Sequence, residues 1–171
     1  GQDARAALQI EPAADATITF ASRREIVLSP ARELTPGTTY RIALKPAGLA
    51  GVPATLRPFE FTLAIKQPEF EVSVGGLTAA GDDRTMTLSG VVATADSEPA
   101  DKVERLLTAI YDGGSPAVSW QHEGDGQRHS FAIQGLKRAA GEQKLRVQWN
   151  GAAIGAKGNG ERELVVPARD R

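Results

Sequence analysis

The chain has 171 residues, of which 41% are hydrophobic and 24% charged, with 20 basic residues against 21 acidic ones and no cysteine. This composition is that of a soluble globular protein with one large or two ordinary domains, and the balanced charge argues against nucleic acid as a partner. The lack of cysteine excludes a disulfide framework, a thiolate metal cluster and a cysteine nucleophile.

Turn-forming residues are frequent, with 18 glycines and 10 prolines, so we expect short strands rather than long helices. No apolar run approaches the length of a membrane span, and the opening "GQDARAALQI" lacks the apolar segment of a signal peptide. These features predict a mature or excised soluble piece of an all-β protein.

Residues 1–66 contain five short β-prone runs, and we expect them to form a small antiparallel β-sandwich of the immunoglobulin-like type. Apolar residues alternate from Tyr40 to Leu44 and again from Phe59 to Leu63, which predicts one buried face on each strand. The Pro36-Gly37 turn leads into Tyr40. We expect its ring to fill the core and its hydroxyl to bond nearby backbone, an architectural role.

A linker is predicted at residues 65–68, where Lys66 and Pro68 separate two complete strand patterns. Residues 67–171 are expected to form a second antiparallel β-sandwich. Its predicted strands are "FEVSV", "TMTLSGVVATA", "AVSWQH", "HSFAIQGL", "KLRVQW" and "RELVVPA".

One segment of the second domain has a helical period. In "SEPADKVERLLTAIY" the apolar residues Val103, Leu106, Leu107 and Ile110 follow the i, i+3, i+4, i+7 pattern. Asp101 and Glu104 resemble a capping box. We therefore predict a short amphipathic helix at residues 101–111 that covers its own sandwich, with docking of a partner as the alternative.

The segment "AVSWQHEGDGQRHSFAI" predicts a hairpin, because Asp125-Gly126 is a favoured two-residue turn. This turn sets three cross-strand pairs on one face. They are Trp120 with Phe131, Val118 with Ile133, and His122 with His129.

The two opposed histidines suggest zinc or copper, but a stable site needs a third ligand and the next pair, Gly124 with Gln127, supplies none. We expect a polar pair and no metal. Below about pH 6, where both rings become cationic, like-charge repulsion should loosen the hairpin tip.

Trp120 and Trp149 share the parity of Val118 and Val147 respectively, so both indoles are expected inside. Inward indoles argue against a sugar-binding platform, for which Tyr111 or a frayed Trp120 would be the remaining candidates.

No other motif predicts a ligand or a reaction. "GAAIGAKGNG" has the wrong spacing for a phosphate loop and is expected to be a connection with turns at Asn150-Gly151 and Asn159-Gly160. Asp82-Asp83 and Asp125 lack the spacing of a calcium loop and are expected to be solvated turns. Neither histidine lies near a nucleophile motif. We predict no catalytic residue, no cofactor, no metal and no enzyme.

Several landmarks together resemble the N-terminal modules of bacterial alpha-2-macroglobulins. They are "TPGTTYRIALKPAGLAG", "FEFTLAIKQPEFEVSV", "MTLSGVVATADSEPADKVE", "VSWQHEGDGQRHSFAIQGLKR" and "LRVQWNGAAIGAKGNGERELVVPA". The likeness spans nearly the whole chain and implies that residues 67–171 are a macroglobulin-like domain.

The resemblance implies non-catalytic scaffold or interaction modules of a large periplasmic protease inhibitor that defends bacteria. Members are usually lipoproteins tethered to the inner membrane, so any membrane contact would come from a lipid anchor outside this chain. Proteases would be targets of the full-length protein, and cell-wall synthesis or other envelope proteins are implied partners. The thioester Cys-Glu-Gln motif and bait segment of the family are not found here. The alternative is an adhesion or carbohydrate-binding module of a secreted or cell-surface protein.

Overall fold

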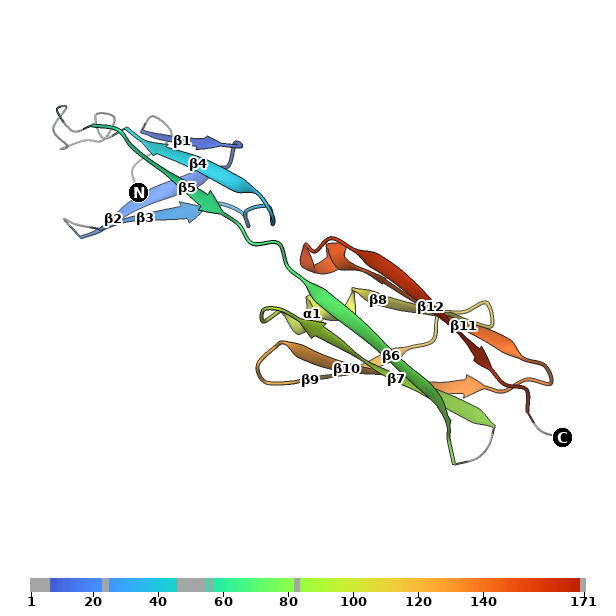
Figure 1. Cartoon of the computed structure of the whole chain (residues 1–171). Coiled ribbons are helices and arrows are strands. Elements are labelled where there is room, and N and C mark those ends of the chain that lie inside the picture. Colours follow the sequence, from blue (N-terminus) through green and yellow to red (C-terminus); the bar gives the residue numbers. More distant parts are fainter. Residues whose placement is uncertain (1–6, 23–24, 46–54, 56, 82–83, 170–171) are drawn as a thin grey trace. The chain divides into compact units, whose positions relative to one another are not determined.

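The computed structural model describes residues 7–22, 25–45, 55, 57–81 and 84–169. The chain divides into two compact units, Gly1–Gln67 and Pro68–Arg171, and the predicted boundary lies within one residue of this division. Both units are built from antiparallel strands, which confirms the all-β prediction (Figure 1). Within the described ranges, no helix is long and apolar enough to cross a membrane.

Unit 1 has a three-stranded sheet in the order β1-β4-β5 and a hairpin of β2 and β3. The strands are β1 (Leu8–Glu11), β2 (Ala16–Ser22), β3 (Glu25–Pro30), β4 (Thr39–Leu44) and β5 (Phe59–Ala64). Ile42 lies opposite both Ile10 and Phe61, so the predicted alternation places the apolar side chains of the three strands on one face.

Tyr40 has the architectural role predicted for it. Its side chain is buried, and its hydroxyl oxygen accepts a hydrogen bond from the backbone N–H of Thr35 at 3.1 Å. Hydrogen bonds from the side chain and backbone of Thr35 lower the pKa of Tyr40. The ring therefore ties the turn at Gly37, which has a φ of 70°, to the first residues of β4.

Replacing Tyr40 by phenylalanine should lower the free energy of unfolding of unit 1 by about 1 kcal/mol, because the Thr35 N–H loses its acceptor in a partly buried hydrogen bond. Urea denaturation followed through the NMR amide signals of Ile42 and Phe61 measures this loss. The reciprocal control is Tyr111→Phe, which changes a hydroxyl of unit 2. An unchanged midpoint for Tyr40→Phe would show that the hydroxyl does not fix the turn.

Unit 2 has two antiparallel sheets, in the orders β6-β7-β10-β9 and β12-β11-β8. The first contains β6 (Phe70–Ala79), β7 (Thr85–Thr94), β10 (Arg128–Lys137) and β9 (Val118–His122). The second contains β12 (Asn159–Val166), β11 (Gln143–Asn150) and β8 (Leu107–Tyr111). A 3-10 helix, η3 (Gly151–Ile154), connects β11 to β12.

A single hydrophobic core joins the two sheets of unit 2. Leu88 and Ile133 of the four-stranded sheet and Leu145 and Val147 of the three-stranded sheet have no exposed surface. Val103, from the helix α1 (Ala100–Glu104), completes the core from one end. These aliphatic side chains provide most of the stabilisation of the unit.

The predicted helix at residues 101–111 is largely wrong. Only α1 is helical, its N-cap is Pro99, and no side chain caps it, so the capping box is also wrong. Residues 107–111 form β8, in which Leu107, Ala109 and Tyr111 are buried while Thr108 and Ile110 are exposed. The strand period of two residues prevails because residues 107–111 pair with β11, the central strand of the three-stranded sheet.

Two glycines lie directly opposite aromatic residues in unit 2. Phe131 pairs with Gly90, and a Cβ placed on Gly90 would meet the ring Cζ at 2.3 Å. Trp149 pairs with Gly160, and a Cβ there would meet the indole at 2.6 Å. In both pairs the ring occupies the space that a side chain on the opposite strand would need.

Candidate functional site

The hairpin of β9 and β10 has the register predicted from its sequence. Trp120 pairs with Phe131, Val118 with Ile133, and His122 with His129. The turn differs from the prediction, because Asp125 has no positive φ and the connection closes through the N–H of Gly126, which donates to the carbonyl of Glu123. Alternation of apolar residues thus determines this register, with a longer turn than expected.

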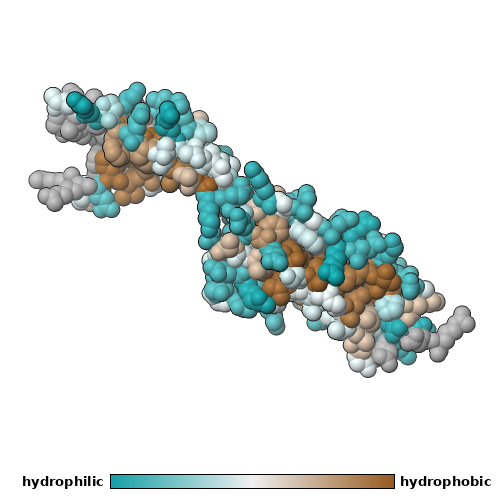
Figure 2. All heavy atoms as spheres, viewed as in Figure 1, coloured by the Kyte–Doolittle hydropathy of each residue, from teal (hydrophilic) through white to brown (hydrophobic). Residues whose placement is uncertain are grey.

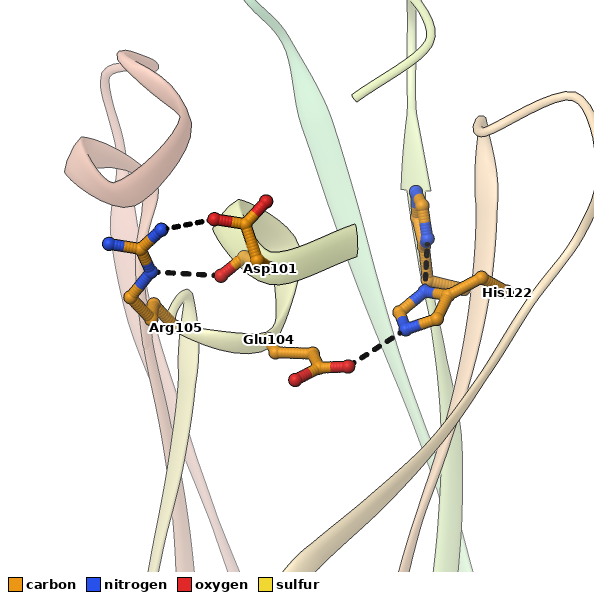
Figure 3. A network of polar contacts seen from close by, with 5 residues as sticks. Asp101, Glu104, Arg105 and His122 are labelled. Atoms are coloured by element: carbon orange, nitrogen blue, oxygen red, sulfur yellow. Dashed lines mark hydrogen bonds and ion pairs between the residues drawn. The ribbon is translucent and has the colours of Figure 1, made fainter. Parts of the chain in front are cut away.

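The two histidines form a hydrogen-bonded network with one carboxylate. The Nδ1 atoms of His122 and His129 are 2.8 Å apart. Nε2 of His122 lies 3.0 Å from Oε1 of Glu104, and Figure 3 marks this contact with a dashed line. Nε2 of His129 lies 3.1 Å from the carbonyl oxygen of Gly126. Glu104 comes from α1, so the network connects α1 to the hairpin.

His129 differs from its partner in burial. Its side chain has no exposed surface, whereas the side chain of His122 is 24% exposed and that of Glu104 is 49% exposed. Burial lowers the pKa of His129, and the nearby charge of His122 lowers it further. The carbonyl of Gly126 and the carboxylates of Asp125 and Glu123 oppose this shift.

The residues that the structure describes contain no group of three or more His, Cys, Asp or Glu side chains placed to hold a metal ion. The histidine pair donates to, and accepts from, its own neighbours in the polar network. Asp125 accepts a hydrogen bond from the backbone N–H of Gln127 at 2.9 Å, which is a turn interaction. Asp82-Asp83 lies outside the described residues.

Both indoles are only partly buried, so the prediction that they lie inside holds in part. They pack against the core of unit 2 at its rim. Trp149 is part of a groove of about 480 Å³ that also includes Arg105, Gln148 and Glu161. Trp120 is part of a second groove of about 440 Å³, together with Phe131 and with serine, alanine and glutamine side chains of the four-stranded sheet.

The glycine-rich connection carries no phosphate-loop geometry. The side chain of Asn150 caps η3 by accepting a hydrogen bond from the N–H of Ala152 at 3.0 Å. Asn159 and Gly160 belong to β12 and pair with β11, so the predicted turn there is wrong. This segment is a structural connection between two neighbouring strands.

Unit 1 contains an apolar groove of about 400 Å³ between its three-stranded sheet and its hairpin. Phe59 is 59% exposed and Ile26 is 46% exposed, and both contribute to the groove with Leu8, Ile18 and Ile42. Figure 2 shows hydrophobic residues of this unit open to solvent. Large exposed apolar residues that cluster in this way are characteristic of contact surfaces.

The pKa shifts of two further groups are explained by burial or by neighbouring side chains. Burial raises the pKa of Tyr111, whose hydroxyl donates to the carbonyl of Lys137 at 2.5 Å. Hydrogen bonding and charge from Lys144, with a further contribution from Arg146, lower the pKa of the exposed Glu163. These groups lie on different strands and do not converge on one cleft.

Comparison of the sequence with models of known families and with curated proteins gives no match.

Proposed function

We propose that the chain forms non-catalytic scaffold and interaction modules of a larger periplasmic, inner-membrane-tethered protease inhibitor that resembles alpha-2-macroglobulin. Its two units would be immunoglobulin-like and macroglobulin-like sandwiches. The resemblance of the sequence landmarks supports the family, and the dispersed arrangement of the titratable groups supports a non-catalytic role.

The observation that carries the non-catalytic role is the separation of shifted titratable groups from the grooves. Tyr40, Tyr111, His129 and Glu163 all have shifted pKa values, and none of them lines any of four grooves in the described part of the chain. An active site usually combines such a group with a cleft and a second reactive side chain. Stable β units with exposed edges and loops serve well as spacers and contact surfaces.

Binding to purified cell-wall synthesis enzymes tests the interaction role. We expect one of them to bind the immobilised chain in the micromolar range, which is typical of contacts between modules of modest area. Phe59→Ser should weaken this binding at least about threefold, because Phe59 is the most exposed aromatic residue of the apolar groove.

The matched control is Val165→Ser, which removes an apolar side chain that is 50% exposed on β12 of unit 2. Equal weakening by both variants would contradict a contact through unit 1. Failure of every tested envelope enzyme to bind would contradict the interaction role and leave a spacer.

A carbohydrate-binding module is the second candidate, and the groove around Trp149 favours it. Amide side chains of Gln148, Asn150 and Asn159 surround a partly exposed indole there, with Arg105 and Glu161 nearby. Aromatic rings and planar polar groups are suitable for contacts with sugars. Titration with peptidoglycan fragments and neutral oligosaccharides should leave the indole N–H signal of Trp149 unchanged under the scaffold proposal. A saturable shift of that signal would favour the second candidate.

A further inference from the structure

The polar network between α1 and the β9–β10 hairpin fixes how many protons its members hold. The carbonyl oxygen of Gly126 can only accept, so Nε2 of His129 must carry a proton. Between the two Nδ1 atoms, 2.8 Å apart, one must donate and the other accept. The carboxylate of Glu104 also accepts, so Nε2 of His122 must carry a proton as well.

These three requirements place three protons on two imidazole rings. Two neutral imidazoles hold only two protons on nitrogen, so the pair must carry one positive charge. The charge can reside on either ring, according to which Nδ1 holds the shared proton. Because His129 has no exposed surface while His122 is 24% exposed and faces Glu104, the charge is placed on His122.

We propose that Glu104, His122 and His129 form a pH-sensitive clasp between α1 and the β9–β10 hairpin, complete only while the two imidazoles share one extra proton. This inference goes beyond the scaffold role, because it assigns a condition-dependent contact to one end of unit 2.

Acid opens the clasp at the contact between the rings. A second extra proton puts a hydrogen on both Nδ1 atoms, so neither can accept and two like charges face each other. The pKa of His129 is lowered in the folded state, so the unfolded chain binds more protons below about pH 6.5. The stability that the neutral ring contributes is therefore present above that pH and is lost as the pH falls toward the folded pKa.

Alkali opens the clasp in a different place. Once the extra proton is lost, His122 is neutral and carries one proton on its two ring nitrogens. Nδ1 faces Nδ1 of His129, and Nε2 faces the carboxylate of Glu104. Whichever of these two contacts keeps the proton, the other contact brings two hydrogen-bond acceptors together without a donor. Contact between α1 and the hairpin should therefore be strongest at intermediate pH and weaker on both sides.

The surrounding groups are compatible with a single positive charge. The hairpin turn contributes Glu123 and Asp125, and Arg128 of β10 forms an ion pair with Glu123 at 3.3 Å. The segment before α1 contributes Glu98, whose N–H donates to the same Gly126 carbonyl. β7 places the buried, uncharged Val92 opposite His129, and the ring of Trp120 stacks on His122 with centroids 6.0 Å apart.

Glu104→Gln separates the two limbs of this pH dependence. A glutamine amide donates to Nε2 of a neutral His122, so the network becomes complete without an extra proton. Hydrogen exchange of the Val103 and Leu106 amides, corrected for intrinsic rates from pH 5 to 9, measures the attachment of α1. In the wild type we expect protection to fall about threefold on the alkaline side and about tenfold on the acid side. In the variant the alkaline fall should vanish and the acid fall should remain.

The matched control is Asp101→Asn, which removes the same charge from α1 but contacts Arg105 instead of a histidine. In this variant, protection should fall on both the acid and the alkaline side, as in the wild type. Nitrogen-15 spectra of the imidazoles provide a second readout, in which His129 of the wild type at neutral pH should be the neutral Nε2–H tautomer. An unchanged alkaline limb in Glu104→Gln, or two imidazoles that titrate independently, would overturn the proposal.

Discussion

Replacing Gly90 by alanine is expected to lower the free energy of unfolding of unit 2 by about 3 kcal/mol. The new Cβ would lie 2.3 Å from Cζ of Phe131 and 2.6 Å from the carbonyl oxygen of Ser73. The backbone contact cannot be relieved by rotating a side chain, and Phe131 is held among buried neighbours. β7 and β10 would have to separate at this pair. Urea denaturation followed by tryptophan fluorescence measures the loss.

Gly76→Ala is the matched control for this prediction. Gly76 lies in β6 of the same sheet, and a Cβ added there meets nothing within 4 Å. Its effect should stay within about 0.5 kcal/mol. Equal effects of the two substitutions would show that the Phe131 ring does not fill the space above Gly90.

Replacing Leu145 by alanine is expected to lower the free energy of unfolding of unit 2 by about 3 kcal/mol. Leu145 has no exposed surface and lies at the centre of β11, paired with both β8 and β12. The cavity left behind would lie where the two sheets meet. Both tryptophans belong to unit 2, so their fluorescence reports the loss without a contribution from unit 1.

The NMR amide signals of Ile42 provide the control for Leu145→Ala, because they report unit 1. Their denaturation midpoint should not move, since the chain divides into separate compact units at residue 67. A common shift of both transitions would show that the two units unfold as one body.

The strand pattern was predictable where alternation and a turn agree. The three pairs of the β9–β10 hairpin, including His122 with His129, were predicted by centring the turn on Asp125-Gly126, and the structure has this register. A slip of one residue would have turned Phe131 and Ile133 to the solvent, so the register tolerated an error in the turn. The partner of the pair, Glu104, was not predictable, because its distance from His122 depends on how α1 packs.

The helical prediction failed because the apolar residues of segment 103–111 fit both a helical and a strand period. Val103, Leu106 and Leu107 suit a helical stripe, while Leu107, Ala109 and Tyr111 suit a strand. The exposure of Ile110 decides between them, and it depends on pairing with β11, which is distant in sequence. Local propensity could not reveal that pairing.

The exposure of a strand side chain was less predictable than the face of the strand on which it lies. Trp149 has the parity of Leu145 and Val147, yet it lies near the end of its strand, where fewer neighbours cover the ring. Phe59 likewise belongs to the predicted apolar alternation of its strand and pairs with Leu44, yet it remains 59% exposed. Alternation reports which face a side chain occupies, whereas its exposure depends on what packs over that face.

The most direct test of the scaffold proposal is to follow the native protein in cells with antibodies raised against this chain. The account predicts that these residues belong to a chain several times longer than 171 residues, retained in the inner membrane and released only by detergent. A freely soluble protein no longer than this chain, released by osmotic shock, would contradict it.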